Sequence, residues 1–215
     1  SRKQGESLQY VASAEKKDFA ANDPDAVNIA NNVLSGSYAR LGLIEKAKYY
    51  QLKSISYLNN SQRDYDINPM AILFGLAGKV NRYAVLGSYY ITEKKPAIAE
   101  SFLNEAIKLY HQLDSPMQML DAPYIFLQMA RCKTLEKNAN SSSYYDTALK
   151  YMDIYQAPPV EYAHYYQEKA ADFISKNLLD SALDNITKAI QIKDSFKLPI
   201  ISYFGELLTG FYKAA

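Results

Sequence analysis

The chain has 215 residues, of which 48% are hydrophobic and 22% are charged, an ordinary balance for a globular protein. Its 24 basic and 23 acidic residues give a formal net charge of +1, so it lacks the concentrated positive charge of a nucleic-acid-binding protein. Its apolar runs stay short of the roughly 18 residues of a membrane-spanning helix, and the single cysteine, Cys132, excludes an intramolecular disulfide.

Helices are predicted along nearly the whole chain. Apolar residues recur at steps of three and four, and the alternating pattern of a half-buried strand is absent. Turn-forming clusters divide the chain and leave room for helices of about 12 to 20 residues joined by short loops. In chain order, these clusters lie at residues 22–24, 59–61, 67–69, 114–116, 138–143 and 157–159.

A repeated pattern groups the helices into pairs. The first helix of each pair carries a small residue, here named the small marker: Ser35, Gly87, Ala130 and Ala170 in turn. The second helix carries further small residues at fixed steps: Ala47 and Ser54, Ala99 and Ala106, Ala148 in the degenerate third copy, and Ala182 and Ala189 in the fourth. Small residues let two antiparallel helices approach closely, while large ones such as Tyr83, Tyr90 and Phe173 fill the holes between pairs. We therefore expect Ala99, Ala106, Ala182 and Ala189 to be buried within their pairs.

The two ends of the chain are predicted to flank these pairs. Residues 1–27 are expected to form an N-terminal helix that acts as a half repeat or a cap. Residues 28–213 hold about four helix pairs and a final single helix. That last helix is expected to open near Pro199, because the first helical turn does not need the missing N–H, and Leu208-Thr209-x2-Tyr212 repeats the opening pattern.

The spacing resembles the tetratricopeptide repeat family. Its pattern of aromatic-x2-Leu-Gly-x2-Tyr followed by Ala-x3-Phe-x2-Ala is matched by Tyr83-x2-Leu86-Gly87-x2-Tyr90 and then Ala99, Leu103 and Ala106. Over residues 28–213 the resemblance implies an all-α fold of antiparallel helix pairs stacked as a right-handed superhelix, an α-α solenoid. The chain departs from the family at its closing proline, which His111 and Asp194 replace in the two best copies. Its markers are 52, 43 and 40 residues apart, against about 34 in the simplest arrays.

The resemblance also implies where binding occurs. In the family, the first helix of each pair lines a concave groove, which here predicts a polar surface with scattered positive charge, suited to an extended peptide or an acidic group. The predicted concave-face residues are Asn32, Arg40, Asn81, Ser88, Tyr124, Arg131, His164 and Gln167. The carboxylate clamp of the chaperone-binding members is missing, since Asn32, Gly36, Ala84 and Ser88 occupy its places.

Patterns for catalysis or metal binding are weak. His111 and His164 are 53 residues apart and have no accompanying ligand set. Asp64, Asp66 and Asn68 imitate half of a calcium loop, but Pro69 stands where that loop needs glycine. Gly75-x2-Gly78-Lys79 is too short for a phosphate loop. We therefore expect no enzyme, no metal and no cofactor.

Two functions remain open at this stage. The first is a protein- or peptide-binding domain that serves as the sensing or interaction module of a bacterial cell-envelope regulator or lipoprotein. Residues 192–196 favour it, because they are similar to the region that closes the repeat array in membrane-bound bacterial sensors. The alternative is an intracellular scaffold that assembles protein partners. The first predicts a periplasmic or envelope location, the second a cytoplasmic one. Both exclude nucleic acid and a membrane span in this segment, any membrane tether lying outside it.

Overall fold

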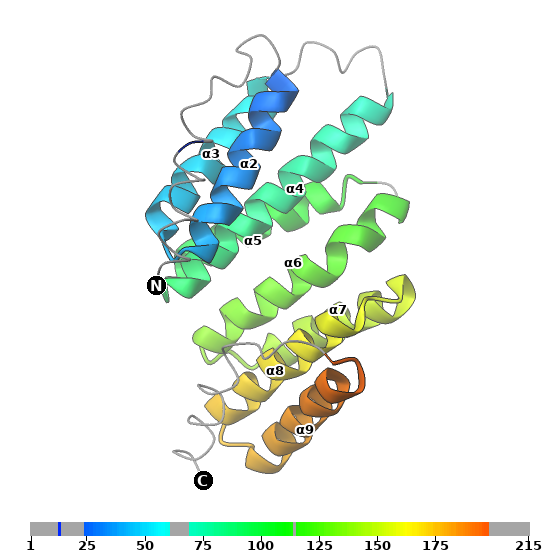
Figure 1. Ribbon diagram of the computed structural model, residues 1–215. Coiled ribbons are helices and arrows are strands. Elements are labelled where there is room, and N and C mark those ends of the chain that lie inside the picture. Colours follow the sequence, from blue (N-terminus) through cyan, green and yellow to red (C-terminus); the bar gives the residue numbers. More distant parts are fainter. Residues whose placement is uncertain (1–12, 14–23, 61–68, 114, 198–215) are drawn as a thin grey trace. The chain divides into compact units, whose positions relative to one another are not determined.

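A computed structural model describes residue 13 and residues 24–60, 69–113 and 115–197 (Figure 1). Within these ranges the chain is helical and has no strand, so the all-α expectation is confirmed. The helices are α2 (Pro24–Arg40), α3 (Ile44–Asn60), α4 (Pro69–Thr92), α5 (Pro96–Tyr110), α6 (Ser115–Leu135), α7 (Ser141–Tyr155), α8 (Pro159–Ser175) and α9 (Leu179–Ser195). None of the helices in the described ranges has the length and apolar character that crossing a bilayer requires.

The chain divides into two compact units, Ser1–Asp121 and Ala122–Ala215, and α6 runs through the division. Helix α2 begins at Pro24, so residues 24–27 belong to it rather than to the separate N-terminal helix that we expected over residues 1–27. The rest of that predicted helix and the predicted final helix lie outside the described residues, apart from Ser13, which is helical. The right-handed superhelix remains a prediction.

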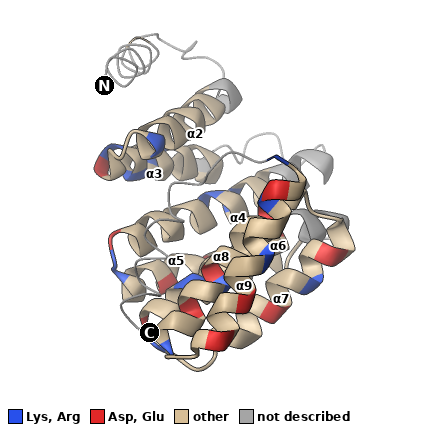
Figure 2. Ribbon diagram, turned by 60° about the horizontal axis from the view of Figure 1, so that its bottom comes forward, with Lys and Arg blue, Asp and Glu red and all other residues tan. Residues whose placement is uncertain are grey.

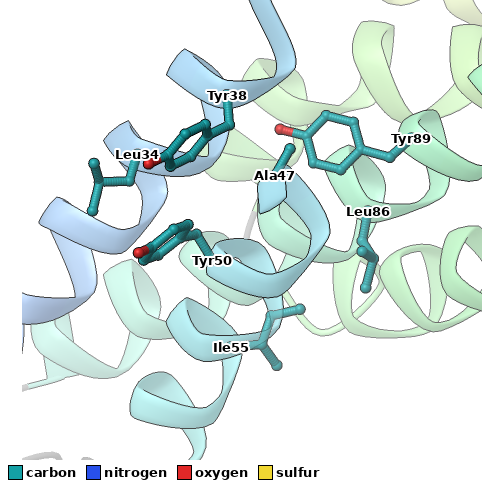
Figure 3. Packing of buried hydrophobic residues seen from close by; sticks show 7 residues of the cluster. All are labelled: Leu34, Tyr38, Ala47, Tyr50, Ile55, Leu86 and Tyr89. Atoms are coloured by element: carbon teal, nitrogen blue, oxygen red, sulfur yellow. The ribbon is translucent and has the colours of Figure 1, made fainter. Parts of the chain in front are cut away.

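In the first unit, α2 packs against α3, α4 packs against α5, and α3 also packs against α4. Its core contains the buried residues Leu34, Tyr38, Ala47, Tyr50, Ile55, Leu86 and Tyr89 (Figure 3). The rings of Tyr38 and Tyr50 are stacked with centroids 5.5 Å apart. Burying such aromatic rings supplies much of the apolar contact area in a core.

In the second unit, α8 packs against α9 and α7 packs against α8. Ala130 of α6, Tyr145, Ala148 and Met152 of α7, and Tyr165 of α8 form one buried cluster. Ala170 of α8 packs with Ile186 and Ala189 of α9 in another. Adjacent helices therefore pack in both units, as in an α-solenoid.

The turns inside the four pairs share one geometry. Seven residues after each small marker, the backbone adopts a positive φ: 75° at Gly42, 56° at Lys94, 53° at Lys137 and 59° at Asn177. The next residue donates its N–H to the carbonyl five residues earlier, at 2.9 Å in every copy: Leu43 to Tyr38, Lys95 to Tyr90, Asn138 to Lys133 and Leu178 to Phe173. These are the bonds of a Schellman helix end. The four markers thus occupy one structural register, including the copy that appeared degenerate.

Close packing inside the pairs follows the small residues. Ala99, Ala106, Ala182 and Ala189 are fully buried, which confirms the expectation for them. A Cβ built on Gly87 would lie 2.8 Å from Leu103 Cγ and 3.3 Å from the Ala99 carbonyl oxygen. Because atoms do not approach this closely, only glycine fits at that position between α4 and α5.

Candidate functional site

The shared register defines a surface on the first helices, α2, α4, α6 and α8. Residues that lie six before, one after and five after each marker follow a helical spacing and therefore share one side of each helix. We name this side the first-helix wall. It comprises Ile29, Gly36, Arg40, Asn81, Ser88 and Thr92 in the first unit, and Tyr124, Arg131, Leu135, His164, Ala171 and Ser175 in the second. All of these residues are exposed or half-buried.

In the second unit, the wall contains three of the predicted binding residues. Tyr124 and Arg131 project from α6, and His164 projects from α8. Tyr124 is 36% exposed, His164 is exposed, and the Arg131 side chain is 28% exposed. Each residue is thus accessible from solvent while its helix packs into the unit.

An ion pair brings α6 and α8 together at this wall. Arg131 Nε lies 3.1 Å from Glu168 Oε2, and Arg131 Nη1 donates to Gln128 Oε1 at 2.9 Å. The Glu168 backbone carbonyl accepts a hydrogen bond from the buried Tyr145 hydroxyl of α7. The guanidinium is thereby held at the surface between two first helices, in a geometry suited to a carboxylate or a carbonyl oxygen of a partner.

In the first unit, the wall contains Arg40, Asn81 and Ser88. Arg40 is exposed near the end of α2, whereas Asn81 and Ser88 are half-buried on α4. The Asn81 side-chain oxygen accepts from Arg82 Nη1, and the Ser88 hydroxyl donates to the Val85 carbonyl of its own helix. Asn32 lies three residues before the marker, beside the wall, and is half-buried.

Gln167 does not lie at an open surface. Only 1% of it is exposed, and its Nε2 has no hydrogen-bond partner among the described residues. It falls three residues before its marker, on the side of α8 that carries the fully buried Ala163 and Ala170. Ala84 has the same register in α4 and is also fully buried. Gln167 is therefore buried where the groove prediction needs an accessible side chain, whereas Asn32, at the same register on α2, is half-buried.

Several wall residues were missed from the sequence. Ile29 is 59% exposed at the register of Asn81, Tyr124 and His164, and Leu135 is 40% exposed at the register of Arg40. Glu168, which pairs with Arg131, was also missed. The register could have identified Ile29 and Leu135, whereas the prediction selected only polar and aromatic residues.

A second set of first-helix residues binds each pair to the pair before it within the same unit. These residues lie five before, two after and six after the marker, and we name this side the bridging face. On α4, Arg82 Nε donates to Ser54 Oγ at 3.2 Å, the Tyr89 and Ser35 hydroxyls lie 2.9 Å apart, and Glu93 lies 2.7 Å from Lys48 Nζ.

On α8, the bridging face carries a buried acid. Asp172 is 1% exposed and accepts hydrogen bonds from Thr134 of α6 and Ser141 of α7, both at 2.8 Å. Lys176 Nζ lies 2.7 Å from the other Asp172 carboxylate oxygen and also donates to Ser141. Because the buried charge is fully paired and hydrogen-bonded, it fixes three helices instead of acting as a reactive group.

Charges of both signs surround these faces. Figure 2 shows basic and acidic residues interspersed along the described helices.

Hydrogen bonding to Lys48 is the main cause that lowers the pKa of Glu93 to about 2, whereas burial raises the pKa of Asp121 to about 6. Burial also raises the pKa of Glu161, against the opposing effect of nearby His164.

Metal-binding side chains do not gather in the part of the chain that the structure describes. No group of three or more His, Cys, Asp or Glu residues there is placed to hold an ion. Cys132 is fully buried, and Gly75 and Gly78 lie within α4. The calcium-loop imitation falls mostly on residues 64–68, outside the described residues.

Comparison of the chain with protein-family models, curated proteins and solved structures gives no match. The resemblance to tetratricopeptide repeats accordingly rests on the sequence pattern alone.

Proposed function

We propose that this chain is a non-enzymatic helical repeat domain, similar to tetratricopeptide repeats, that binds a protein or peptide along its first-helix wall. The observation that carries the proposal is the Arg131–Glu168 ion pair. It links the first helices α6 and α8, and this link supports the inference that Tyr124, Arg131 and His164 lie on one accessible side of the second unit. A tyrosine ring offers contact area at low entropic cost, and arginine offers directional hydrogen bonds, the two properties that recur at binding hot spots.

The chemistry of this wall favours a polypeptide partner over a small metabolite. Its residues combine an aromatic ring, a cation and an imidazole along α6 and α8, and the carboxylate of Glu168 lies beside them. Such spaced, mixed groups suit a chain that presents several side chains and carbonyl oxygens in succession. The role that we propose is the sensing or interaction module of a bacterial cell-envelope regulator or lipoprotein, and this part rests on the sequence resemblance of residues 192–196.

The test compares partner affinity between matched surfaces of the second unit. A partner is first identified by cross-linking in cells or from a peptide array, and its Kd is measured for Tyr124→Ala, His164→Ala and the unchanged chain. Leu183→Ala, at a half-exposed position on the second helix α9, is the control. We expect each wall variant to weaken binding by about tenfold, the effect of a hot-spot residue worth more than 1 kcal/mol, and the control to bind normally.

Arg131→Ala is a separate arm, because this substitution also removes the ion pair to Glu168. Its melting temperature is compared with that of Glu168→Gln, which removes the same pair and keeps the arginine. Loss of binding in Arg131→Ala but not in Glu168→Gln would assign the arginine to the partner. Normal affinity in all wall variants, with loss in Leu183→Ala, would place the binding surface on the second helices and contradict the proposal.

A further inference from the structure

Arg82, on the bridging face of α4, is a half-buried cation without an ion-pair partner among the described residues. By contrast, the basic groups of Arg131, Lys133 and Lys176 each lie 2.7–3.1 Å from a carboxylate oxygen. Burial lowers the pKa of the Arg82 guanidinium, against the opposing effect of the Asp121 charge. Removing a cation from water is costly unless an opposite charge compensates it. The compensation of the Arg82 charge is therefore incomplete within the described chain.

Hydrogen bonds to neutral groups orient the Arg82 side chain. Its Nε donates to Ser54 Oγ at 3.2 Å, and the Ser54 hydroxyl in turn donates to the Asn28 side-chain oxygen. Its Nη1 donates to Asn81 Oδ1 at 3.1 Å, and Gln51 Nε2 donates to the Arg82 backbone carbonyl at 3.1 Å. These partners come from α2, α3 and α4. They fix the direction of the guanidinium and leave its charge unneutralised.

The remaining edge of the guanidinium has donors without acceptors. The second N–H of Nη1 and both N–H groups of Nη2 make no hydrogen bond in the part of the chain that the structure describes. Two neighbouring guanidinium nitrogens form the fork that binds both oxygens of a carboxylate. Arg82 is only half-buried, and Asn81 belongs to the first-helix wall, so this edge adjoins an accessible surface.

We propose that Arg82 is a binding site for one carboxylate group, which it holds in bidentate form on Nη1 and Nη2. A carboxylate matches a single guanidinium in charge and geometry, whereas a phosphate carries more charge than one guanidinium balances. Ser54 and Asn81 already orient the donor, which lowers the entropic cost of binding. The position differs from those of the chaperone carboxylate clamp, which fall on Ala84 and Ser88 in this helix pair.

This inference goes beyond the proposed function and does not rest on it. Arg82 lies on the bridging face of the first unit, and its ligand is defined by one chemical group. That group can belong to a small organic acid or to a polypeptide. The experiment therefore begins with the carboxylate alone.

Melting temperatures in matched salts test the site. The unchanged chain and Arg82→Gln are heated in about 100 mM sodium acetate, and in sodium chloride and sodium phosphate at the same ionic strength. Salts also stabilise proteins nonspecifically, so the quantity compared is the Arg82-dependent shift, the part that the unchanged chain shows and Arg82→Gln lacks. We expect acetate to give an Arg82-dependent shift of about 3 °C over chloride, as for a Kd near 10 mM, and phosphate to give a smaller one.

Two further variants separate the fork from the charge. Arg82→Lys keeps the positive charge and lacks the planar fork, so it should retain less than half of the acetate shift. Lys53→Gln, at an exposed position of α3 in the same unit, removes the same charge and should retain the full shift. Circular dichroism in chloride checks that each variant is folded, and Arg82→Lys carries the comparison if Arg82→Gln is not.

Blocked tripeptides distinguish the sources of the carboxylate. N-acetyl-Gly-Glu-Gly-amide and its glutamine counterpart replace acetate at the same concentration. A shift with acetate and with the glutamate peptide assigns the site to acidic side chains of a polypeptide, and a shift with acetate alone assigns it to small free acids. Equal melting temperatures of the unchanged chain in acetate and chloride would overturn the proposal. So would an acetate shift that persists undiminished in Arg82→Gln or Arg82→Lys, or a larger Arg82-dependent shift in phosphate.

Discussion

Gly87 and Gly36 differ in the space that surrounds them, although both lie on first helices. A Cβ on Gly87 would meet Leu103 Cδ2 at 2.9 Å as well as Cγ, whereas a Cβ on Gly36 would have only Arg40 Nη1 at 4.0 Å. We predict that Gly87→Ala lowers the free energy of unfolding by about 1–3 kcal/mol through overpacking. Gly36→Ala should raise it by up to about 1 kcal/mol, because alanine favours the helix. Urea unfolding of both variants measures the difference, and equal stabilities would contradict the packing at Gly87.

Asp121 makes the stability of the fold depend on pH. Burial raises its pKa to about 6, more than the nearby Arg82 lowers it. The protonated form is thus favoured in the folded state. Protonated Asp121 contributes its full stabilisation of the folded state below the unfolded pKa near 3.8. This contribution is lost as the pH rises from about 4 to about 6. Asparagine carries no charge at any of these pH values. We therefore predict that the stability of Asp121→Asn relative to the unchanged chain increases by about 1–2 kcal/mol as the pH rises from 4 to 7.5, a value that allows for the partial exposure of Asp121.

Denaturant midpoints of both proteins across this pH range measure the gain. The control is Asp184→Asn at an exposed position of α9, which removes one carboxylate and leaves the surroundings of Asp121 unchanged. If the two substitutions gave the same pH profile, the burial of Asp121 would not be the cause.

The carboxylate of Asp172 joins helices α6, α7 and α8 through hydrogen bonds. Asp172→Ala leaves Thr134, Ser141 and Lys176 without the acceptor they share, so we predict a loss of about 2–4 kcal/mol in the free energy of unfolding. Asp184→Ala on α9 should stay within about 0.5 kcal/mol of the unchanged chain. Hydrogen exchange should locate the Asp172→Ala loss in these three helices. A loss confined to α9 would mean that the network does not hold them together.

The helix pairs could be predicted because their signals are local. Proline and asparagine clusters mark the helix ends, and the small residues recur at steps that antiparallel packing requires. The third copy seemed degenerate because Ala148 follows Ala130 by 18 residues instead of 19, yet Lys137 completes the same turn as Gly42. Lysine gives no sequence signal for a positive φ, so the equivalence of this turn needed the structure.

The wall was predicted less well than the pairs. Tyr124, Arg131 and His164 follow the register of the wall and are accessible, but Gln167 lies three residues before its marker and is buried. The wall residues were selected largely because polar side chains are usually exposed. Gln167 and Asp172 are polar and buried, so polarity alone does not identify an accessible position. The Asp172 network joins residues 31 and 38 positions apart in the sequence, a distance over which no periodicity connects them.

The charge balance of the whole chain leads to a prediction about nucleic acid. The net charge is +1, and residues of both signs are interspersed along the described helices, so we expect little attraction for phosphate groups. We predict no measurable binding of a labelled DNA duplex by fluorescence anisotropy at about 150 mM salt. Weak binding at about 10 mM salt should disappear on adding salt, as for any nonspecific attraction. Salt-resistant binding would contradict this prediction and reopen nucleic acid as a partner.

The shared turn also determines how such a chain can change its length during evolution. From each marker to the first buried small residue of the second helix, the path is 12, 12, 11 and 12 residues, whereas the markers themselves are 52, 43 and 40 residues apart. The third copy, one residue shorter, still buries Ala148, but longer changes within a turn would rotate the second helix by about 100° per residue and carry its small residues out of the contact. Insertions between pairs leave that contact intact. Growth, domain insertion and reporter fusion are therefore better accommodated between the helix pairs than inside their turns.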